Sequence, residues 1–146
     1  MPRLVYLYPW QEIDAIDVYV DTDWAGCART RKSTSGGCVM LGRHMIKSWS
    51  STQPGVTLSS GEAELCGVIR GSGMGLGFQS LLKYLGQEMP IRVWTDSSGA
   101  IGICTRQGLG KLRHIDKHLL WIQQAVRSGR VSFAFPILDT CPSYNV

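Results

Sequence analysis

Apolar and polar positions alternate between residues 16 and 21, where Ile16, Val18 and Val20 are separated by single polar or aromatic residues. This period of two is typical of a β-strand with one buried face. We therefore expect a first strand that begins at Ile16 and ends near Asp21. Further apolar or alternating runs predict four more strands, at residues 38–41, 45–50, 91–95 and 130–135.

Three segments between these strands predict helices. Ser59 followed by Glu62 fits a capping box, and a rough apolar stripe continues as far as Leu85. Five glycines interrupt this stripe between residues 67 and 77, and each costs about 0.8–1 kcal/mol relative to alanine in a helix interior. The sequence alone does not distinguish close packing against a sheet from unselected drift. Two shorter helices are expected, at residues 99–104 and around residues 116–128, the second capped by Asp116.

The order strand, helix, strand predicts that the strands at 16–21 and 91–95 are parallel, with a right-handed crossover between them. If these strands are neighbours, the aspartates that end them, Asp21 and Asp96, meet at one edge of the sheet, where ligand sites of such sheets lie. A helix between them carries a third carboxylate. Glu62 has a capping role available, so we assign the functional role to Glu64.

These three carboxylates predict a divalent metal site. Phosphodiester hydrolysis needs an activated water and neutralisation of the leaving oxygen, and two Mg²⁺ ions about 3.5–4 Å apart supply both. Magnesium prefers carboxylate oxygens, and a cluster without His or Cys fits Mg²⁺ better than Zn²⁺. We therefore expect Asp21, Glu64 and Asp96 to act as catalytic and metal-binding residues, with Mn²⁺ as a possible substitute.

Composition limits the class of protein. The 146 residues fit one folded domain, with 44% hydrophobic and 18% charged residues. The net charge of +4 is compatible with a polyanionic partner, and the five cysteines form no CxxC pair. No apolar run approaches the ~20 residues of a membrane span, and no signal peptide is recognisable. We expect an intracellular protein, cytoplasmic or nuclear, with reduced thiols and no membrane partner.

Six blocks of the sequence, in this order, resemble the ribonuclease H domain of Copia-type retrotransposon Pol polyproteins. They are Tyr19–Gly26, Arg31–Gly37, Trp49–Gln53, Leu58–Glu64, Thr95–Ile101 and Arg113–Asp116. The resemblance covers about residues 16–135, after a lead-in at 1–15. It implies an α/β ribonuclease H-like fold, with a mixed five-stranded sheet, its first three strands antiparallel, and helices packed against it.

The resemblance also implies a function. Ribonucleases H of this family cut the RNA strand of an RNA–DNA hybrid endonucleolytically, with Mg²⁺, during reverse transcription. The implied partners are the hybrid and the reverse transcriptase and integrase domains of the same polyprotein. The family's first three metal carboxylates fall on Asp21, Glu64 and Asp96. Asp21 is favoured over Asp23, which we expect to cap the turn that follows.

One block of the family pattern is missing. The family carries a fourth metal-binding aspartate after the last strand, in an Ala-Asp block followed by Thr-Lys. Here the irregular tail at 136–146 lacks that block, and we do not assign the role to Asp139. A truncated or frame-changed copy is expected. Whether the domain is an enzyme stays open: the alternative is an inactive remnant with at most weak nucleic-acid binding. A duplex-cutting nuclease of the same fold, such as an integrase or resolvase, is a third option.

Two basic segments are candidates for contact with nucleic acid, although a solvated surface is the competing interpretation of both. Their residues are Arg31, Lys32 and Ser33 in the first segment, and Lys111, Arg113 and His114 in the second. The tryptophans Trp24, Trp49, Trp94 and Trp121 are expected to pack in or against the core rather than to stack on bases.

Overall fold

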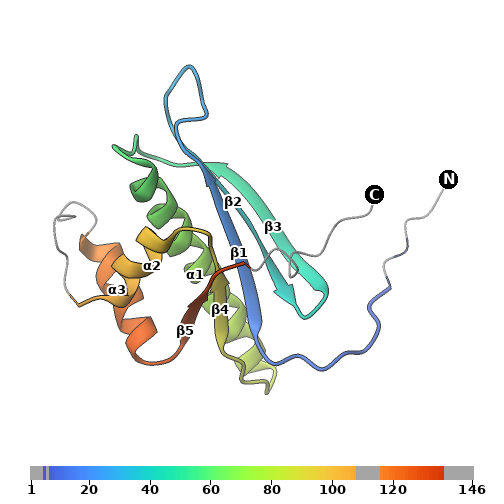
Figure 1. The fold of residues 1–146 in the computed structure, drawn as a ribbon. Helices are drawn as coiled ribbons and strands as arrows, with labels where there is room; N and C mark the ends of the chain where they lie inside the picture. Colours follow the sequence, from blue (N-terminus) through green and yellow to red (C-terminus); the bar gives the residue numbers. More distant parts are fainter. Residues whose placement is uncertain (1–4, 6, 108–115, 137–146) are drawn as a thin grey trace.

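The protein forms a mixed sheet of five strands, in the order β3-β2-β1-β4-β5, as a computed structural model shows (Figure 1). The structure describes residues 5, 7–107 and 116–136, without the side chains of residues 116–119. The strands are β1 (Ile16–Asp23), β2 (Thr34–Leu41), β3 (His44–Thr52), β4 (Ile91–Trp94) and β5 (Val131–Ala134). Strands β1, β2 and β3 are antiparallel, whereas β4 is parallel to both β1 and β5. The predicted mixed sheet and its parallel pair are confirmed.

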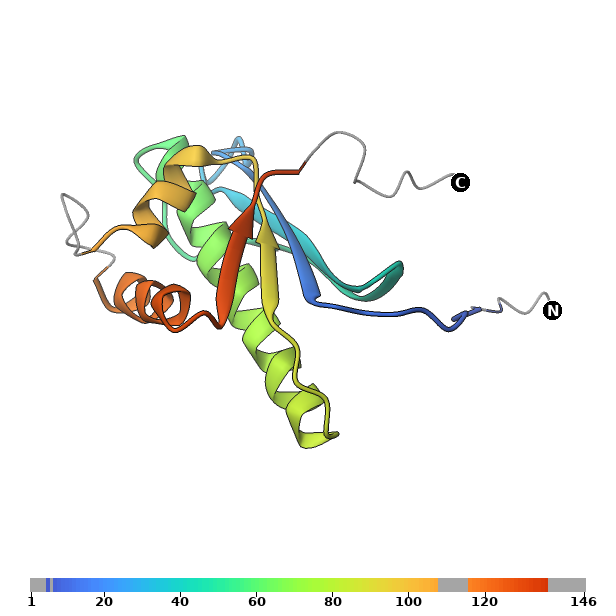
Figure 2. The same cartoon turned by 60° about the horizontal axis from the view of Figure 1, so that its bottom comes forward.

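Three helices lie on one side of this sheet (Figures 1 and 2). They are α1 (Ser60–Tyr84), α2 (Ser98–Thr105) and α3 (Asp116–Arg127). Helix α1 crosses β1, β2 and β4, and α2 and α3 pack beside it. No helix in the described part of the chain covers the other side of the sheet. None of the described helices is long and apolar enough to span a membrane.

Strand β2 begins at Thr34, four residues before the start that its apolar run predicts. Its first half contains Gly36 and Gly37, which pair with Asp21 and Val20 of β1. A Cβ atom at Gly37 would lie 2.3 Å from the Tyr19 carbonyl oxygen and 2.4 Å from the Trp49 ring. Because a side chain at Gly37 would overlap these atoms, glycine occupies the position. The first half of β2 therefore shows no apolar alternation in the sequence.

Three of the five glycines in α1 allow the helix to approach the sheet closely. Cβ atoms added at Gly67, Gly71 and Gly75 would lie 2.4 Å from Thr22 Oγ1, 2.4 Å from Val20 Cγ2 and 2.9 Å from Ile91 Cγ2, respectively. Gly73 and Gly77 meet no atom within 4 Å. Because successive glycines meet successively earlier residues of β1, α1 runs antiparallel to β1. The start of α1 therefore lies at the carboxyl end of β1.

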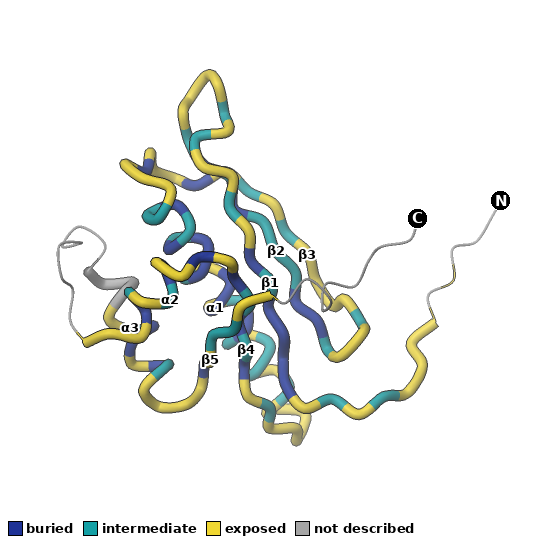
Figure 3. The backbone as a smooth tube through the Cα atoms, in the orientation of Figure 1, coloured by how far each residue is buried: buried dark blue, intermediate teal, exposed yellow. Residues whose placement is uncertain are grey.

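The core fills the space between the sheet and α1. Figure 3 shows the buried residues along β1, β4 and the sheet-facing side of α1. Val18 and Val20 face the helix, and the intervening Tyr19 faces the other side of the sheet. Trp24 corrects our expectation: it is 49% exposed, because it follows the end of β1 and lies in the turn beyond the sheet. Trp49, Trp94 and Trp121 are half-buried, as expected.

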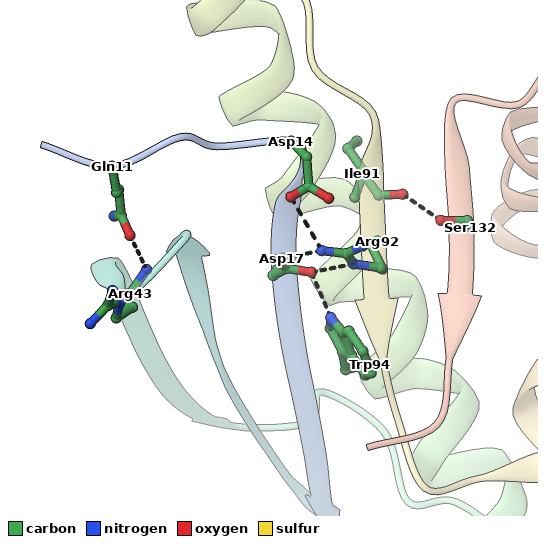
Figure 4. Close-up of polar contacts among 8 residues, drawn as sticks. All are labelled: Gln11, Asp14, Asp17, Arg43, Ile91, Arg92, Trp94 and Ser132. Atoms are coloured by element: carbon green, nitrogen blue, oxygen red, sulfur yellow. Dashed lines mark hydrogen bonds and ion pairs between the residues drawn. The ribbon is translucent and has the colours of Figure 1, made fainter. Parts of the chain in front are cut away.

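The lead-in, which shows no periodicity in the sequence, contacts the β2–β3 hairpin through the Gln11 side chain and through His44, whose ring nitrogen pairs with the Pro9 carbonyl oxygen at 2.9 Å. The Gln11 amide nitrogen donates to the Leu41 carbonyl oxygen at 2.9 Å. The Gln11 amide oxygen accepts from the Arg43 backbone N–H at 3.0 Å (Figure 4). The amide thus serves as both donor and acceptor at the hairpin turn. Such a contact depends on a pairing across about thirty residues, which no local pattern indicates.

Candidate active site

Two of the three predicted carboxylates lie together at one edge of the sheet. Strands β1 and β4 pair in parallel from Ile16 with Ile91 to Tyr19 with Trp94. Asp21 and Asp96 each lie two residues beyond that last pair, and both are exposed. They line the same hollow, of about 460 Å³. The parallel register therefore brings two acidic side chains, far apart in the sequence, to one accessible site.

The hollow opens on the side of the sheet that faces away from α1. Side chains alternate along β1, so that Val18, Val20 and Thr22 meet the helix and the residues between them point to the other side. Tyr19, Trp94 and Met45 are among the residues that line the hollow. The site therefore combines carboxylates at one end with an aromatic surface beside them.

Glu64 lies at the same end of the sheet but does not line this hollow. It is half-buried in the first turns of α1, one turn before Gly67, which contacts Thr22 near the end of β1. Residues three apart share a helix face, so Glu64 belongs to the side of α1 that faces the sheet. Among the residues that the structure describes, no three His, Cys, Asp or Glu side chains are grouped to hold a metal ion.

Glu62, the first glutamate of α1, takes part in capping the helix. The Ser59 hydroxyl accepts from the backbone N–H of Glu62 at 3.2 Å, which confirms Ser59 as the N-cap. The Glu62 carboxylate accepts from the Leu58 N–H at 2.8 Å, rather than from Ser59 as a capping box predicts. Glu62 therefore has a structural role at the helix start, as expected, with a donor one residue earlier than predicted.

A buried carboxylate that the sequence did not indicate, Asp17, binds two side chains beside the hollow. Asp17 is 8% exposed and accepts two hydrogen bonds from Arg92, at 2.7 and 3.2 Å (Figure 4). It also accepts from the Trp94 indole N–H at 2.6 Å. The hydrogen bond to Asp17 raises the pKa of Arg92. The only sequence signal was a polar residue inside an apolar strand, which by itself predicts an exposed face.

Trp94 is held from three sides. Its ring stacks on Tyr19, with centroids 5.7 Å apart and an angle of 8° between the planes. The Arg92 guanidinium lies 5.5 Å from its centroid, and Asp17 accepts its N–H. Because Trp94 precedes Asp96 by two residues, this cluster fixes the strand end that carries the carboxylate.

The first basic segment forms a loop beyond the end of β1. Arg31 is exposed and has a positive φ of 55°, and Lys32 is half-buried. Ser33 is fully buried: its hydroxyl accepts from the Ala25 N–H at 3.1 Å and pairs with the Thr57 hydroxyl at 3.0 Å. Ser33 thus holds the loop, and its hydroxyl does not face solvent. Lys111, Arg113 and His114 lie outside the described residues.

The environments of the cysteines differ. The four cysteines within the described part of the chain are thiols rather than disulfides. Hydrogen bonds with Thr30 lower the pKa of Cys27, in the loop after Asp21. Burial raises the pKa of Cys104 to about 12. Cys27 is therefore the more reactive of these two thiols.

Comparison with known proteins finds relatives for most of the chain. No family model matches it. It is 37% identical over 119 residues to the retrovirus-related Pol polyproteins from transposons RE2 and RE1 of Arabidopsis thaliana. Each match covers 79% of this chain but 8% of the relative, so the chain spans a small part of the length of these polyproteins.

Solved structures share the fold. LC11-RNase H1, isolated from compost by a metagenomic approach, matches with a TM-score of 0.61 and 14% identity over 87% of each chain. The chain has the ribonuclease H fold. The same LC11-RNase H1 in complex with an RNA/DNA hybrid gives a TM-score of 0.56 at 15% identity, covering 85% of this chain and 86% of that one. The ribonuclease H fold and the relationship to transposon Pol polyproteins, both predicted from the six sequence blocks, are confirmed.

Proposed function

We propose that this ribonuclease H domain hydrolyses the RNA strand of RNA–DNA hybrids endonucleolytically, with Mg²⁺, as part of retrotransposon reverse transcription. The observation that supports this most strongly is the pair Asp21 and Asp96, adjacent at the ends of parallel strands and lining one hollow. Because both carboxylates are exposed, a hard cation can bind them without a conformational change of the protein.

The proposed function assigns metal-binding and hybrid-binding roles to different residues. Asp21 and Asp96 would hold the metal through carboxylate oxygens, and Glu64 would complete the set from the start of α1. Two bound ions would supply Lewis-acid activation of the phosphodiester. Arg31 and Lys32 would contact the hybrid backbone, and the 2′-hydroxyls of the RNA strand would distinguish it from DNA. Tyr19 and Trp94 line the same hollow as the two aspartates.

The comparisons support the substrate and the context. A structural neighbour was solved in complex with an RNA/DNA hybrid. The relatives are Pol polyproteins, so the proposed partners include reverse transcriptase and integrase domains of the same polyprotein. Reverse transcription of this kind would place the domain in the cytoplasm or the nucleus.

The test is cleavage of a hybrid labelled on its RNA strand, in Mg²⁺ and separately in Mn²⁺. Asp21→Asn and Asp96→Asn should lower the rate roughly 100-fold or more, since a metal contributes several kcal/mol of transition-state stabilisation. Asp23→Asn is the matched control, because Asp23 is an exposed aspartate of the same strand that lies outside the hollow. Equal losses in all three variants, or faster cleavage of duplex DNA, would contradict the proposal.

A second function is supported by one observation. Within the described residues no third carboxylate joins Asp21 and Asp96, so the domain could bind hybrid without cutting it. This inactive remnant would show salt-sensitive hybrid binding, because backbone contacts release counterions, and no cleavage at high protein concentration.

A further inference from the structure

A buried amide links the part of α1 that carries Glu64 to the sheet. Gln53 is 5% exposed, and its side-chain nitrogen makes two hydrogen bonds. It donates to the Ala63 carbonyl oxygen at 2.8 Å and to the Ser35 hydroxyl at 2.7 Å. Ala63 is the residue directly before Glu64. One side chain therefore ties the glutamate-bearing turn to strand β2.

The same link reaches the strand that carries Asp21. The Thr22 hydroxyl donates to the Ser35 hydroxyl oxygen at 3.5 Å. The backbone N–H of Thr22 donates to the Asp21 carboxylate at 2.8 Å. A continuous series of contacts thus runs from Ala63 through Gln53, Ser35 and Thr22 to Asp21.

Helix packing at this junction is an independent observation. A Cβ atom at Gly67 would lie 2.4 Å from Thr22 Oγ1 and 3.5 Å from the Ser35 hydroxyl oxygen. The helix therefore comes close to Ser35, which accepts from Gln53, and to Thr22, which donates to Ser35. Any side chain at Gly67 would push the first turns of α1, and Glu64 with them, away from the end of β1.

The link uses the donor end of the Gln53 amide. In the described part of the chain, its buried oxygen has no hydrogen-bond partner. An unpaired buried oxygen is costly, so a residue chosen for core stability alone would be apolar here. Position 53 instead carries an amide, and its NH₂ group donates to both Ala63 of α1 and Ser35 of β2.

We infer that Gln53 is a positioning residue that sets where Glu64 stands relative to Asp21, with Gly67 providing the close approach. This inference rests on the proposed function, since it assigns Glu64 to the metal site. Supporting residues outside the ligand set of metal sites typically change metal affinity by about 10–100-fold when altered. Gln53 is expected to act in this way.

The test measures Mn²⁺ binding by calorimetry, without substrate, in Gln53→Met. Methionine keeps the length of the side chain but cannot donate. The matched control is Gln123→Met, because Gln123 is 1% exposed and also donates its side-chain nitrogen to a backbone carbonyl, that of Ile103, at 3.0 Å. We expect the Mn²⁺ Kd to rise about 10-fold in Gln53→Met, and not in Gln123→Met, while hybrid binding in EDTA stays the same in both.

Two glycine variants keep the inference testable if Gln53→Met does not fold. Cβ atoms at Gly67 and Gly71 would approach the sheet equally closely, at 2.4 Å, but Gly71 lies one turn farther from Glu64. Gly67→Ala should weaken Mn²⁺ binding, and Gly71→Ala should weaken it much less. The inference would be overturned if the Mn²⁺ Kd were the same in Gln53→Met and Gln123→Met, and also the same in Gly67→Ala and Gly71→Ala. The proposed function would remain intact in that case. A wild-type domain that binds no Mn²⁺ would refute the proposed function itself.

Discussion

The glycines of α1 give a prediction whose size follows from the packing. Gly71→Ala adds a methyl group 2.4 Å from Val20 Cγ2 and 3.4 Å from Val18 Cγ1. Gly73→Ala adds the same group two residues later, where no atom lies within 4 Å. Both positions are in the interior of one continuous helix, so the two variants differ only in what the new methyl group meets.

The two energetic terms can be separated. Alanine gains about 0.8–1 kcal/mol over glycine in a helix interior, and this gain is the same in both variants. Overpacking a tight interface costs typically about 1–3 kcal/mol. Val20 is buried and β-branched, so it has little freedom to move aside. We expect Gly73→Ala to be more stable than wild type, and Gly71→Ala to be less stable than Gly73→Ala by about 1–3 kcal/mol.

Urea unfolding followed by tryptophan fluorescence measures this difference. Trp49 lies within 4 Å of the added methyl group at Gly71, so the signal reports on this interface. With an m-value of about 2 kcal/mol per M, the midpoints should differ by roughly 0.5–1.5 M. The double variant Gly71→Ala/Val20→Ala should be more stable than the sum of its single changes predicts, because the overlap is removed.

Equal midpoints for Gly71→Ala and Gly73→Ala would refute the reasoning. In that case α1 would not approach β1 as closely as described. The glycines would then be compatible with the drift that the sequence alone could not distinguish from selected packing.

Two further predictions follow from side-chain contacts. Asp17→Ala removes two hydrogen bonds to Arg92 and one to Trp94. It should lower the free energy of unfolding by about 2–4 kcal/mol. This value is discounted for solvent screening, because the Arg92 side chain is 34% exposed. A loss below about 1 kcal/mol in thermal or urea unfolding would contradict the prediction. Cys27 should react with iodoacetamide faster than Cys104 near neutral pH, because a lowered pKa populates the thiolate at lower pH. Mass spectrometry of labelled peptides over a pH series checks the order, and equal rates would disprove it.

The elements with a local signal could be predicted from the sequence. Alternation located the start of β1, the Ser59 hydroxyl located the start of α1, and the acidic ends of two strands indicated Asp21 and Asp96. These signals depend on residues within one turn or one strand. A parallel register then follows from the order of the elements, which is why the two aspartates could be expected to meet.

Features that depend on contacts between distant segments could not be predicted. The first half of β2 pairs through a threonine, a serine and two glycines, which carry no apolar pattern. The Gln53 amide joins residues from two other elements, and Asp17 meets Arg92 across about seventy-five positions. Trp24 shows the converse: an aromatic residue suggests burial, but its place beyond the strand end leaves it exposed.

The most direct test of the metal site is an anomalous difference map from crystals of the wild-type domain soaked in Mn²⁺. If Asp21 and Asp96 hold the metal, a peak is expected within coordination distance, about 2.1 Å, of carboxylate oxygens of both residues. A well-occupied peak bound elsewhere, or no peak in crystals that diffract well at a saturating Mn²⁺ concentration, would contradict this assignment.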